Sequence, residues 1–521
     1  MKSSTSQKSR LSEPVARLVR VSLARPSLND NRSPETRLRE ALEGSVFLPL
    51  SVIKDLSRLT FSEKYDLDCI LLTTCGGQKV ARVDKATKLR NPLGVAIDLG
   101  STTIVLYLLD LVDGKELARR TYENPQRAHG EDILARILYA SKNDGLERLK
   151  DEVLDVFNKG IVELTSEIGS SPEDVYFCSI AGNTTMIHFL LGLDPSHICK
   201  EPYIPCANTL DILKSKEIGL KIHPEGEVYC FPNVGSYFGG DLLAGIIASG
   251  MHTREEISML IDVGTNAEVV LGNSSWMVAC AGAAGPALEG GILTCGMRAE
   301  PGAIERVTIS PEDLTVTYKT IKGERPKGLC GSGIIDLLAE LFVAGLVDPT
   351  GKLEPQKCPE RMRDIDGETA FVVAFENESY SKAPIFITQS DIKNLIRSKG
   401  AMYTILNVVL QSVGIGFEDV DKFYVAGAFG NYIDPEKAVT IGMLPDVPLN
   451  KFVGLGNAAG LGAKELLLNQ GAIKEANEIT KKITYLEMNV RGDFMSQLTG
   501  ALFLPHTDRS KFPNVWKKIK A

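Results

Sequence analysis

Two short segments of this chain place an aspartate, a glycine and small polar side chains at the end of an apolar run. The first reads Asp-Leu-Gly-Ser-Thr-Thr at residues 98–103, and the second reads Asp-Val-Gly-Thr-Asn-Ala-Glu at residues 262–268. An aspartate at the end of a buried strand can hold a hydrated magnesium ion. A tight glycine turn beside it aims successive amides and hydroxyls at one anion. Both segments therefore have the residue types that bind magnesium and phosphate.

Either segment alone is more often a polar β-hairpin, but the pattern occurs twice, roughly 160 residues apart, which favours a duplicated α/β domain. Two such hairpins facing each other would clamp a triphosphate from both sides. The catalytic candidates are Asp98 and Asp262, which would hold the magnesium shell or position water, and Glu268, which would orient the attacking water or pair with a neighbour. The residues expected to contact phosphate are Gly100, Ser101, Thr102, Thr103, Gly264, Thr265 and Asn266.

A third segment reads Val-Ala-Gly-Ala-Phe-Gly-Asn at residues 425–431 and follows an apolar run. Its small residues would let an adenosine approach the backbone closely, although an ordinary glycine-rich turn would have the same composition. The residues expected to contact adenosine are Gly427, Ala428, Phe429 and Gly430. Three such segments in this order predict a protein that binds ATP and Mg²⁺.

This order of segments resembles the superfamily of actin, Hsp70 and the sugar kinases. Further motifs resemble one branch of that superfamily, the ATP-dependent reductive activators of corrinoid proteins. They lie at residues 124–126, 129–130, 181–188, 239–241, 330–336, 389–400 and 503–506. The resemblance covers most of the chain, and residues 15–90 are similar to the linker domain that precedes the ATPase core in that family.

The resemblance implies an enzyme, an ATPase that returns an inactive Co(II) corrinoid to Co(I). This reduction is uphill from common electron donors, so the family couples it to ATP through a conformational change. The implied partner is a corrinoid protein of a methyltransferase system. The resemblance also implies a homodimer.

The cysteine pattern departs from the best-known members of this family, which carry an iron–sulfur domain ahead of the linker. This chain starts at the linker, and its ten cysteines are dispersed with no Cys-x-x-Cys among them. We therefore expect reduced thiols, no intrinsic iron–sulfur cluster, and electrons from a separate ferredoxin-like partner.

Two other functions fit parts of the pattern. A chain without a redox role would be an ATP-dependent clamp or chaperone for a corrinoid methyltransferase system. A small-molecule kinase would need a catalytic carboxylate and a sugar-binding insertion, and the sequence shows neither clearly.

Two single residues have structural interpretations. His188 lies on an apolar helix face, as buried core histidines do. Lys399 is expected to close the helix that precedes the adenosine segment, where a cation can cap the carboxyl end.

The three segments need strands that end at one site. We predict a duplicated actin-like ATPase fold of the α/β class, with two lobes around a nucleotide cleft, preceded by a small α/β linker domain. Expected strands include residues 15–23, 69–74, 94–99, 104–111, 260–263, 268–272 and 423–426, and expected helices include 33–42, 130–141 and 146–168. The predicted domains are a flexible N-terminus at 1–14, a linker-like domain at 15–91, a first lobe at 92–235 and a second lobe with a C-terminal segment at 236–521.

Composition excludes several classes of function. The chain has 521 residues, of which 44% are hydrophobic and 24% charged, as in ordinary globular proteins. Its net charge of -8 argues against a general nucleic-acid binder. No apolar run is long enough to span a membrane, and no secretory signal is visible. We expect a cytoplasmic protein.

Overall fold

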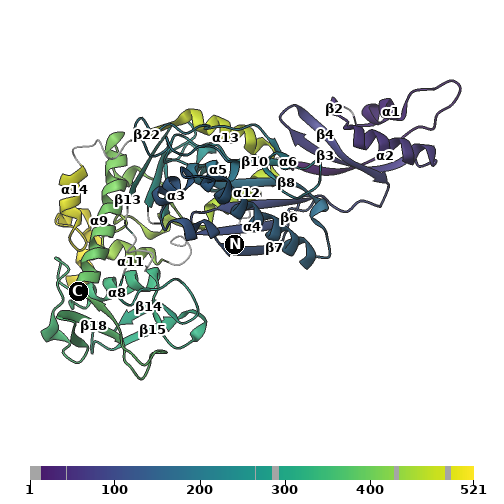
Figure 1. Cartoon of the computed structure of the whole chain (residues 1–521). Helices are drawn as coiled ribbons and strands as arrows, with labels where there is room; N and C mark the ends of the chain where they lie inside the picture. The colour runs from purple at the N-terminus through teal and green to yellow at the C-terminus, as the bar shows by residue number, and fades with distance from the viewer. Residues whose placement is uncertain are drawn as a thin grey trace, which may run out of the picture. The chain divides into compact units, whose positions relative to one another are not determined.

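The protein is described from a computed structural model (Figure 1). The structure describes residues 13–42, 44–264, 266–283, 285, 293–427, 433–486 and 494–520. The chain forms two compact units: the first runs to Ala248 and takes in Ala458–Lys481, and the second comprises Ser249–Asn457 with Lys482 onward. Each unit is therefore assembled from two separate parts of the sequence, whereas the sequence pattern placed one boundary between residues 235 and 236.

A small four-stranded sheet with two helices opens the first unit. Its strands lie in the order β1-β3-β4-β2. The elements are β1 (Ala16–Ser22), α1 (Pro34–Ala41), β2 (Val46–Phe47), α2 (Leu50–Phe61), β3 (Asp66–Thr74) and β4 (Gly77–Lys85). Apolar residues of both helices and of β3 form one buried cluster, so α1 and α2 cover the sheet. This four-stranded sheet, which we call the linker sheet, has the α/β composition predicted for residues 15–91 and belongs to the first compact unit.

The start of α1 shows why the local sequence was informative. The Ser33 side chain accepts a hydrogen bond from the Thr36 backbone N–H at 3.2 Å, and Pro34 occupies the first helical position. A serine cap followed by proline is a strong helix-start signal, because both residues suit a helix end that lacks backbone partners. The observed helix begins within one residue of the predicted one.

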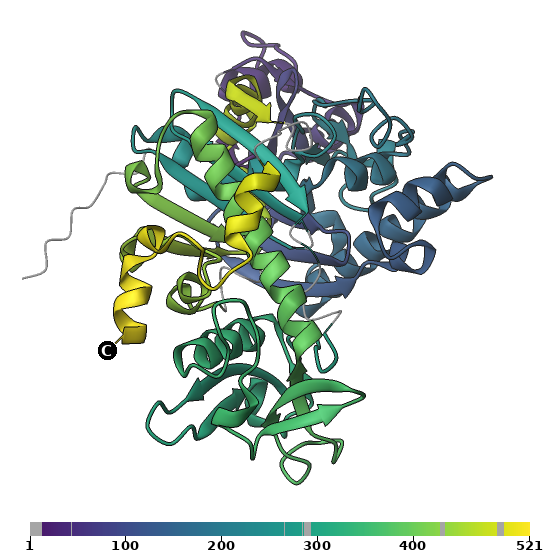
Figure 2. The ribbon, with the colours of Figure 1, turned by 90° about the vertical axis from the view of Figure 1, so that its left-hand side faces the viewer.

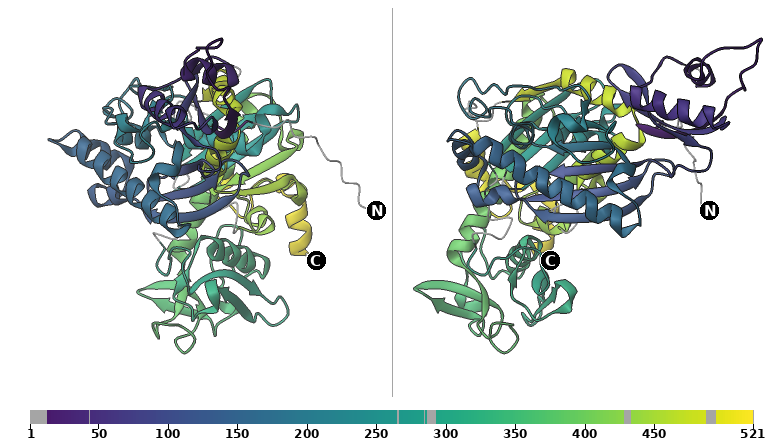
Figure 3. Two further views of the ribbon diagram at one scale, coloured as in Figure 1. Left: turned by 90° about the vertical axis from the view of Figure 1, so that its right-hand side faces the viewer. Right: turned by 45° about the vertical axis from the view of Figure 1, so that its right-hand side comes forward.

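The main sheet of the first unit has six strands in the order β7-β6-β5-β8-β10-β9. Its strands are β5 (Leu93–Leu99), β6 (Thr103–Asp110), β7 (Glu116–Glu123), β8 (Val175–Gly182), β9 (Leu213–Lys214) and β10 (Glu227–Cys230). Its helices are η1 (Pro125–His129), α3 (Ile133–Ala140), α4 (Gly145–Glu167), α5 (Thr184–Leu191), α6 (Ser215–Ile218), α7 (Gly240–Ser249), α12 (Ala458–Leu468) and α13 (Gly471–Lys482). Figure 3 shows α4 lying along this sheet.

Helices bury both faces of β5. Val95 and Ile97 face the apolar cluster that includes Phe157 of α4. Gly94 faces the other way, where an added Cβ would lie 3.2 Å from Leu467 of α12. Strands that are apolar on both faces are typical of a sheet covered by helices on each side. In β5 the covering leaves the carboxyl end of the strand as the place where its polar residue Asp98 is only partly buried.

The main sheet of the second unit also has six strands, in the order β21-β20-β11-β12-β13-β22. Its strands are β11 (Ser258–Val263), β12 (Asn266–Gly272), β13 (Met277–Ala283), β20 (Lys422–Ala426), β21 (Phe452–Gly456) and β22 (Ile483–Leu486). The helices around it are α9 (Gln389–Ser412), α11 (Pro435–Thr440), α14 (Phe494–Ala501) and α15 (Pro513–Lys520).

The two main sheets repeat one arrangement. In the first unit β7, β6 and β5 are antiparallel neighbours, and β8 and β10 follow β5 in parallel. In the second unit β13, β12 and β11 are antiparallel neighbours, and β20 and β21 follow β11 in parallel. The repeated order confirms the duplicated α/β fold predicted from the two aspartate segments.

Two small sheets complete the second unit. Their elements are β14 (Ala303–Ile309), β15 (Val316–Thr320), β16 (Gly328–Leu329), α8 (Gly331–Val343), β17 (Met362–Ile365), β18 (Glu368–Ala374) and β19 (Ile385–Thr388). The helix α9 runs from these small sheets to the main sheet of its unit (Figure 2). Although α9 has 24 residues, no helix in the described part of the chain is long and apolar enough to span a membrane.

Candidate functional site

The first aspartate hairpin ends in a turn whose shape depends on glycine. β5 and β6 pair antiparallel, with Leu99 opposite Ile104, and Asp98 lies partly buried at the end of β5. The Gly100 backbone N–H donates to the Thr103 carbonyl oxygen at 3.1 Å. A Cβ on Gly100 would lie 2.6 Å from that same oxygen, so only glycine fits without a shift of the backbone. The predicted hairpin at residues 94–111 is confirmed.

Three hydrogen bonds from outside the turn hold its carbonyl groups. Asn124 donates from its side-chain nitrogen to the Gly100 oxygen at 2.8 Å, and from its backbone N–H to the Thr102 oxygen at 2.8 Å. Arg136 of α3 donates from Nη1 to the Ser101 oxygen at 2.6 Å. Both donor residues are fully buried. The turn is therefore fixed from its carbonyl side.

The backbone N–H groups of Ser101 and Thr102 point away from Asn124 and Arg136, because N–H and C=O point in opposite directions in a trans peptide group. Among the residues that the structure describes, none accepts a hydrogen bond from the backbone N–H of Ser101 or Thr102. Ser101 is half-buried, whereas Thr102 and Thr103 are exposed. Amides and hydroxyls arranged around a fixed turn suit an anion such as phosphate. The four residues of this turn are thus brought together as the sequence predicts, on a backbone that is already held in place.

Two further polar residues lie at the same edge of the sheet as Asp98. Because β5, β8 and β10 are parallel, their carboxyl ends share one edge, where ligands of α/β proteins usually bind. Asn183 follows β8 and caps α5 with its side chain, and Asp241 lies in the first turn of α7, after β10. Gly239 lets them approach, because a Cβ there would collide with the Asn183 Cα and would lie 2.6 Å from Asp241 Oδ1.

The environment of Asp241 gives it chemistry that the sequence did not reveal. Loss of hydration raises the pKa of its carboxyl to about 6, although the Leu242 backbone N–H donates to Oδ1 at 2.9 Å and lowers it somewhat. A carboxylate with a pKa just below neutrality can take a proton from water at pH 7. In the sequence, residues 239–241 stood out only as a family-like motif. Their position between a buried strand and a helix start was the signal for a functional role.

The second aspartate hairpin carries two carboxylates that face each other. β11 and β12 pair antiparallel with Asp262 directly opposite Glu268. Side chains at such positions have Cβ atoms about 4.5–5.5 Å apart and lie on the same face of the sheet. The register therefore lets Asp262 and Glu268 act on one ligand. In the first hairpin the residue opposite Asp98 is the apolar Val105.

The end of β20 abuts the second aspartate. β11 and β20 are parallel, with Asp262 beside Ala426. The next residue, Gly427, has a backbone φ of 75°. An added Cβ there would lie 2.9 Å from Asp262 Oδ1 and 3.3 Å from the Val263 carbonyl oxygen. Glycine is required at this position both for the left-handed backbone and for the close approach to the carboxylate.

Part of the predicted site lies outside the described residues. This part comprises Thr265, Ala428, Phe429 and Gly430. Gly264 is described and half-buried, and the backbone of Asn266 begins β12. The nucleotide contacts of all six residues stay predictions.

The cysteines take no visible part in the site. All ten have free thiols, as their dispersed spacing predicts. Burial raises the pKa of the Cys280 thiol to about 12, which makes it a poor nucleophile. Within the described ranges, no group of three or more His, Cys, Asp or Glu side chains is arranged to hold a metal ion.

His188 has the structural role expected of it. His188 is buried, and its ring nitrogens bond to the Thr184 carbonyl oxygen at 2.7 Å and to the Cys206 backbone N–H at 3.1 Å. The prediction for Lys399 is wrong, because Lys399 is buried in the middle of α9. Its amine donates to two backbone carbonyls, those of Phe503 and Pro505. This buried amine links the C-terminal segment to α9 and does not cap the carboxyl end of the helix.

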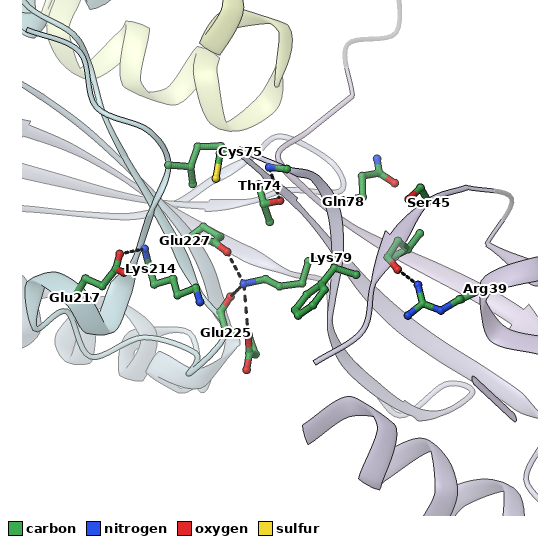
Figure 4. A pocket seen from close by; sticks show the side chains of 14 residues that line it. Arg39, Ser45, Thr74, Cys75, Gln78, Lys79, Lys214, Glu217, Glu225 and Glu227 are labelled. Carbon is green, nitrogen blue, oxygen red and sulfur yellow. Dashed lines mark hydrogen bonds and ion pairs between the residues drawn. The ribbon is translucent and has the colours of Figure 1, made fainter. Parts of the chain in front are cut away.

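A cavity of about 560 Å³ lies elsewhere in the first unit, where the linker sheet meets the edge of the main sheet (Figure 4). There the Lys79 amine forms a buried ion pair with Glu227 and also donates to the Glu225 carbonyl oxygen at 2.9 Å. Glu227 begins β10, whereas Asp98 and Asp241 lie at or beyond the carboxyl ends of the parallel strands. The cavity is therefore at the opposite edge of the sheet from the aspartate hairpin.

Family comparisons cover both units. A family model described as the C-terminal domain of RACo, the ASKHA domain, matches residues 256–516. A second one, described as the RACo middle region, matches residues 93–254. Their junction lies close to the division between the two compact units after Ala248.

Similar proteins of named activity extend the comparison. The corrinoid activation enzyme RamQ of Eubacterium limosum is 32% identical over 461 residues, which cover 87% of this chain and 77% of that protein. The [Co(II) methylated amine-specific corrinoid protein] reductase of Methanosarcina barkeri is 24% identical over 420 residues, with coverage of 75% and 73%. The solved structure of a reductive activator for a corrinoid, iron–sulfur protein superposes with a TM-score of 0.88 at 40% identity, covering 96% of this chain and 81% of that one.

Proposed function

This chain belongs to the RACo family of reductive activators of corrinoid proteins, and on that premise we propose that it uses ATP to return a corrinoid protein from Co(II) to Co(I). The relatives named for corrinoid activation and for Co(II) corrinoid protein reduction support this proposal. Reduction of Co(II) adds one electron at a very low potential. ATP would supply the driving force through a change of conformation.

The braced turn at residues 100–102 is the observation that carries the ATP part of the proposal. Its carbonyls are held by Asn124 and Arg136, and its amides face outward. A phosphate can thus be bound without first ordering the loop, which removes an entropic cost from binding. We propose that phosphate oxygens accept hydrogen bonds from the Ser101 and Thr102 amides.

Magnesium fits the carboxylates that the two hairpins provide. Mg²⁺ keeps much of its water and binds proteins through one or two carboxylates together with substrate phosphates. Asp98 and Asp262 would hold such a hydrated ion, which would neutralise charge on the transferring phosphoryl group. Glu268 lies directly across from Asp262 and would orient one of its waters.

Asp241 is our candidate for the residue that accepts the proton of the attacking water. The water oxygen forms a bond to the γ-phosphorus while the bond to the oxygen bridging to ADP breaks. The proton of the water passes to the Asp241 carboxylate, whose pKa of about 6 leaves it ionised at neutral pH. Asn183, which lies at the same sheet edge, would help to hold that water.

We propose a separate ferredoxin-like iron–sulfur protein as the electron donor and a corrinoid methyltransferase component as the acceptor. One electron leaves the reduced cluster of the donor and reduces Co(II) to Co(I). A homodimer, as the family resemblance implies, is part of the same proposal. No residue of this chain needs to carry the electron as a cluster ligand.

The test is anaerobic absorbance of a Co(II) corrinoid protein mixed with this chain, with and without ATP, and with and without a reduced iron–sulfur donor. Growth of the Co(I) band, or of the methyl-Co(III) band when a methyl donor is present, should require all three components. ATP hydrolysis with an unchanging cobalt spectrum for every donor would favour a clamp or chaperone. A phosphorylated small molecule among the products would favour a kinase.

A further inference from the structure

Arg136 is a buried cation without a nearby counter-ion among the described residues. Its side chain is fully buried, and it donates from Nε to the Gly130 carbonyl oxygen at 2.8 Å and from Nη1 to the Ser101 carbonyl oxygen at 2.6 Å. In the described part of the chain, no carboxylate oxygen lies within salt-bridge distance of its guanidinium. A buried charge held only by neutral carbonyls is costly, and burial lowers the pKa of Arg136 accordingly.

The acidic residues closest in sequence are already engaged elsewhere. Glu131 forms an ion pair with Arg127 at 3.1 Å, and Asp132 caps α3 by accepting from the Ala135 backbone N–H at 2.7 Å. Their attraction for Arg136 acts over a longer range and is opposed by repulsion from Arg127. The charge of Arg136 is therefore only partly compensated by the protein itself.

The hydrogen bond from Arg136 to the turn explains what the charge of its guanidinium could do. The Ser101 carbonyl belongs to the same peptide group as the Thr102 N–H. A cation on the carbonyl oxygen polarises that peptide group and makes its N–H a stronger donor, because hydrogen bonds in a chain strengthen one another. Asn124 acts in the same way, without a charge, on the peptide group between Gly100 and Ser101.

We propose that Arg136 is a positioning residue that senses bound phosphate through the peptide group of Ser101 and Thr102. This inference rests on the proposed function, in which that turn binds the triphosphate. An anion bound at the Thr102 amide offsets the remaining positive charge of the buried Arg136 guanidinium. In turn, the guanidinium raises the affinity of that amide for the anion. Binding of ATP and docking of α3 are thereby linked, since α3 carries Arg136.

The test compares Arg136→Ala and Arg136→Lys with the wild-type chain, using ATP itself as the probe. The matched control is Arg120→Ala, which removes a guanidinium of the same unit that is paired with Glu163 and Glu167 and does not touch the turn. Loss of a charge-assisted hydrogen bond should raise the KM for ATP roughly 10- to 100-fold in R136A. The kcat should change less than the KM, and R120A should match the wild type.

Two further readouts separate sensing from a merely structural role. Added methylguanidinium should restore ATP binding to R136A, whereas methylurea should not. The rise in melting temperature on adding ATP should fall by more than half in R136K, which keeps a charge without the planar fork. If R136A does not fold, the R136K thermal shift gives the answer alone.

The outcomes distinguish this inference from the proposed function. A wild-type chain that fails to bind ATP would remove the basis of both. A wild type that binds ATP while R136A and R136K bind it equally well would overturn the role of Arg136 alone. An equal loss of stability with and without ATP in both variants would also overturn that role, because Arg136 would then act only on the fold.

Discussion

The two aspartate hairpins have the same scaffold but present different chemistry. Each lies in the middle of a sheet in which three antiparallel strands are followed by two parallel ones. Asp98 and Asp262 each lie near the end of the corresponding strand, beside an alanine of the parallel neighbour. The residue across the hairpin differs, since Val105 faces the first aspartate and Glu268 faces the second. The backbone frame is therefore the same in the two units, whereas the side chains that face the two aspartates differ.

Because of this difference, we expect the two hairpins to bind different ligands. The first turn has its carbonyls held from behind and its amides directed outward, which suits an anion. The second hairpin opposes two carboxylates, and a pair of like charges at this spacing suits a cation. We expect the first unit to bind phosphate and provide the proton acceptor Asp241, and the second to contribute more to cation affinity.

The largest expected effect is that of Asp241→Asn. Loss of a general base should lower ATP turnover roughly 100- to 10,000-fold, with a much smaller change in the KM for ATP. In the wild type, turnover should rise with pH through about 6, because Asp241 must be ionised to accept a proton. The residual turnover of D241N should lose that rise. Steady-state phosphate release across the pH range measures both.

The control for this prediction is Asp211→Asn, which neutralises an exposed aspartate of the same unit. D211N should behave as the wild type at every pH. If D241N retains more than a tenth of wild-type turnover, or if its pH profile keeps the wild-type shape, the proton acceptor lies elsewhere.

A second comparison separates the two hairpins directly. Asp98→Ala and Asp262→Ala should each abolish most ATP turnover while the circular dichroism spectrum stays that of the wild type. The milder Asp262→Asn and Glu268→Gln should raise the Mg²⁺ concentration needed for half-maximal turnover roughly tenfold or more, and more than Asp98→Asn does. If Asp262→Asn, Glu268→Gln and Asp98→Asn need the same Mg²⁺ concentration, the second hairpin does not contribute more to cation affinity than the first. Unchanged turnover in both alanine variants would refute the nucleotide site as a whole.

A smaller effect should follow from Asn124→Ala. The substitution removes the donor to the Gly100 oxygen and leaves that carbonyl without its brace, so the turn loses order. The KM for ATP should rise roughly 3- to 10-fold, and the free energy of unfolding should fall by about 1–3 kcal/mol. Asn158→Ala is the matched control, because Asn158 also donates to a backbone carbonyl, that of Gly219, but far from the turn. A KM change of equal size in both variants would mean that bracing of the turn is unimportant.

The smallest expected effect concerns stability. The pKa of Asp241 is about 6 in the folded chain, above its value near 3.9 in an unfolded chain. Stability from this group is therefore fully present below the unfolded pKa and is lost as pH rises through about 6. At pH 8 D241N should exceed the wild type by roughly 1–3 kcal/mol, and at pH 4 the gain should nearly vanish. Urea denaturation at both pH values measures this difference in the free energy of unfolding. An equal gain at both pH values would mean that the ionised carboxylate of Asp241 does not destabilise the folded chain.

The hairpins could be predicted from sequence because their information is local. An aspartate, a glycine and hydroxyl residues within six positions specify a strand end and a tight turn, as residues 98–103 show. Asn124, Arg136 and Asp241 could not be assigned in this way. They reach the turn or its sheet edge from segments that follow it by 20 to more than 100 residues, and only the packed sheet brings them there.

Lys399 shows how a local signal can mislead. A lysine followed by glycine is typical of a helix end, but α9 continues through both residues to Ser412. Gly400 serves packing, because a Cβ there would lie 3.0 Å from the Ala501 carbonyl oxygen. The glycine is thus required by a contact with a helix about a hundred residues away, which no local pattern can reveal.

The measurement that tests the central claim most directly records phosphate release and the Co(I) absorbance band in the same anaerobic sample, for the wild type and for D241N. The samples contain a Co(II) corrinoid protein, ATP and a reduced iron–sulfur donor. In the wild type both signals should grow together, and in D241N both should slow by the same large factor. Growth of the Co(I) band in D241N at the wild-type rate without phosphate release would contradict the account, because cobalt reduction would then not depend on hydrolysis of ATP by this chain.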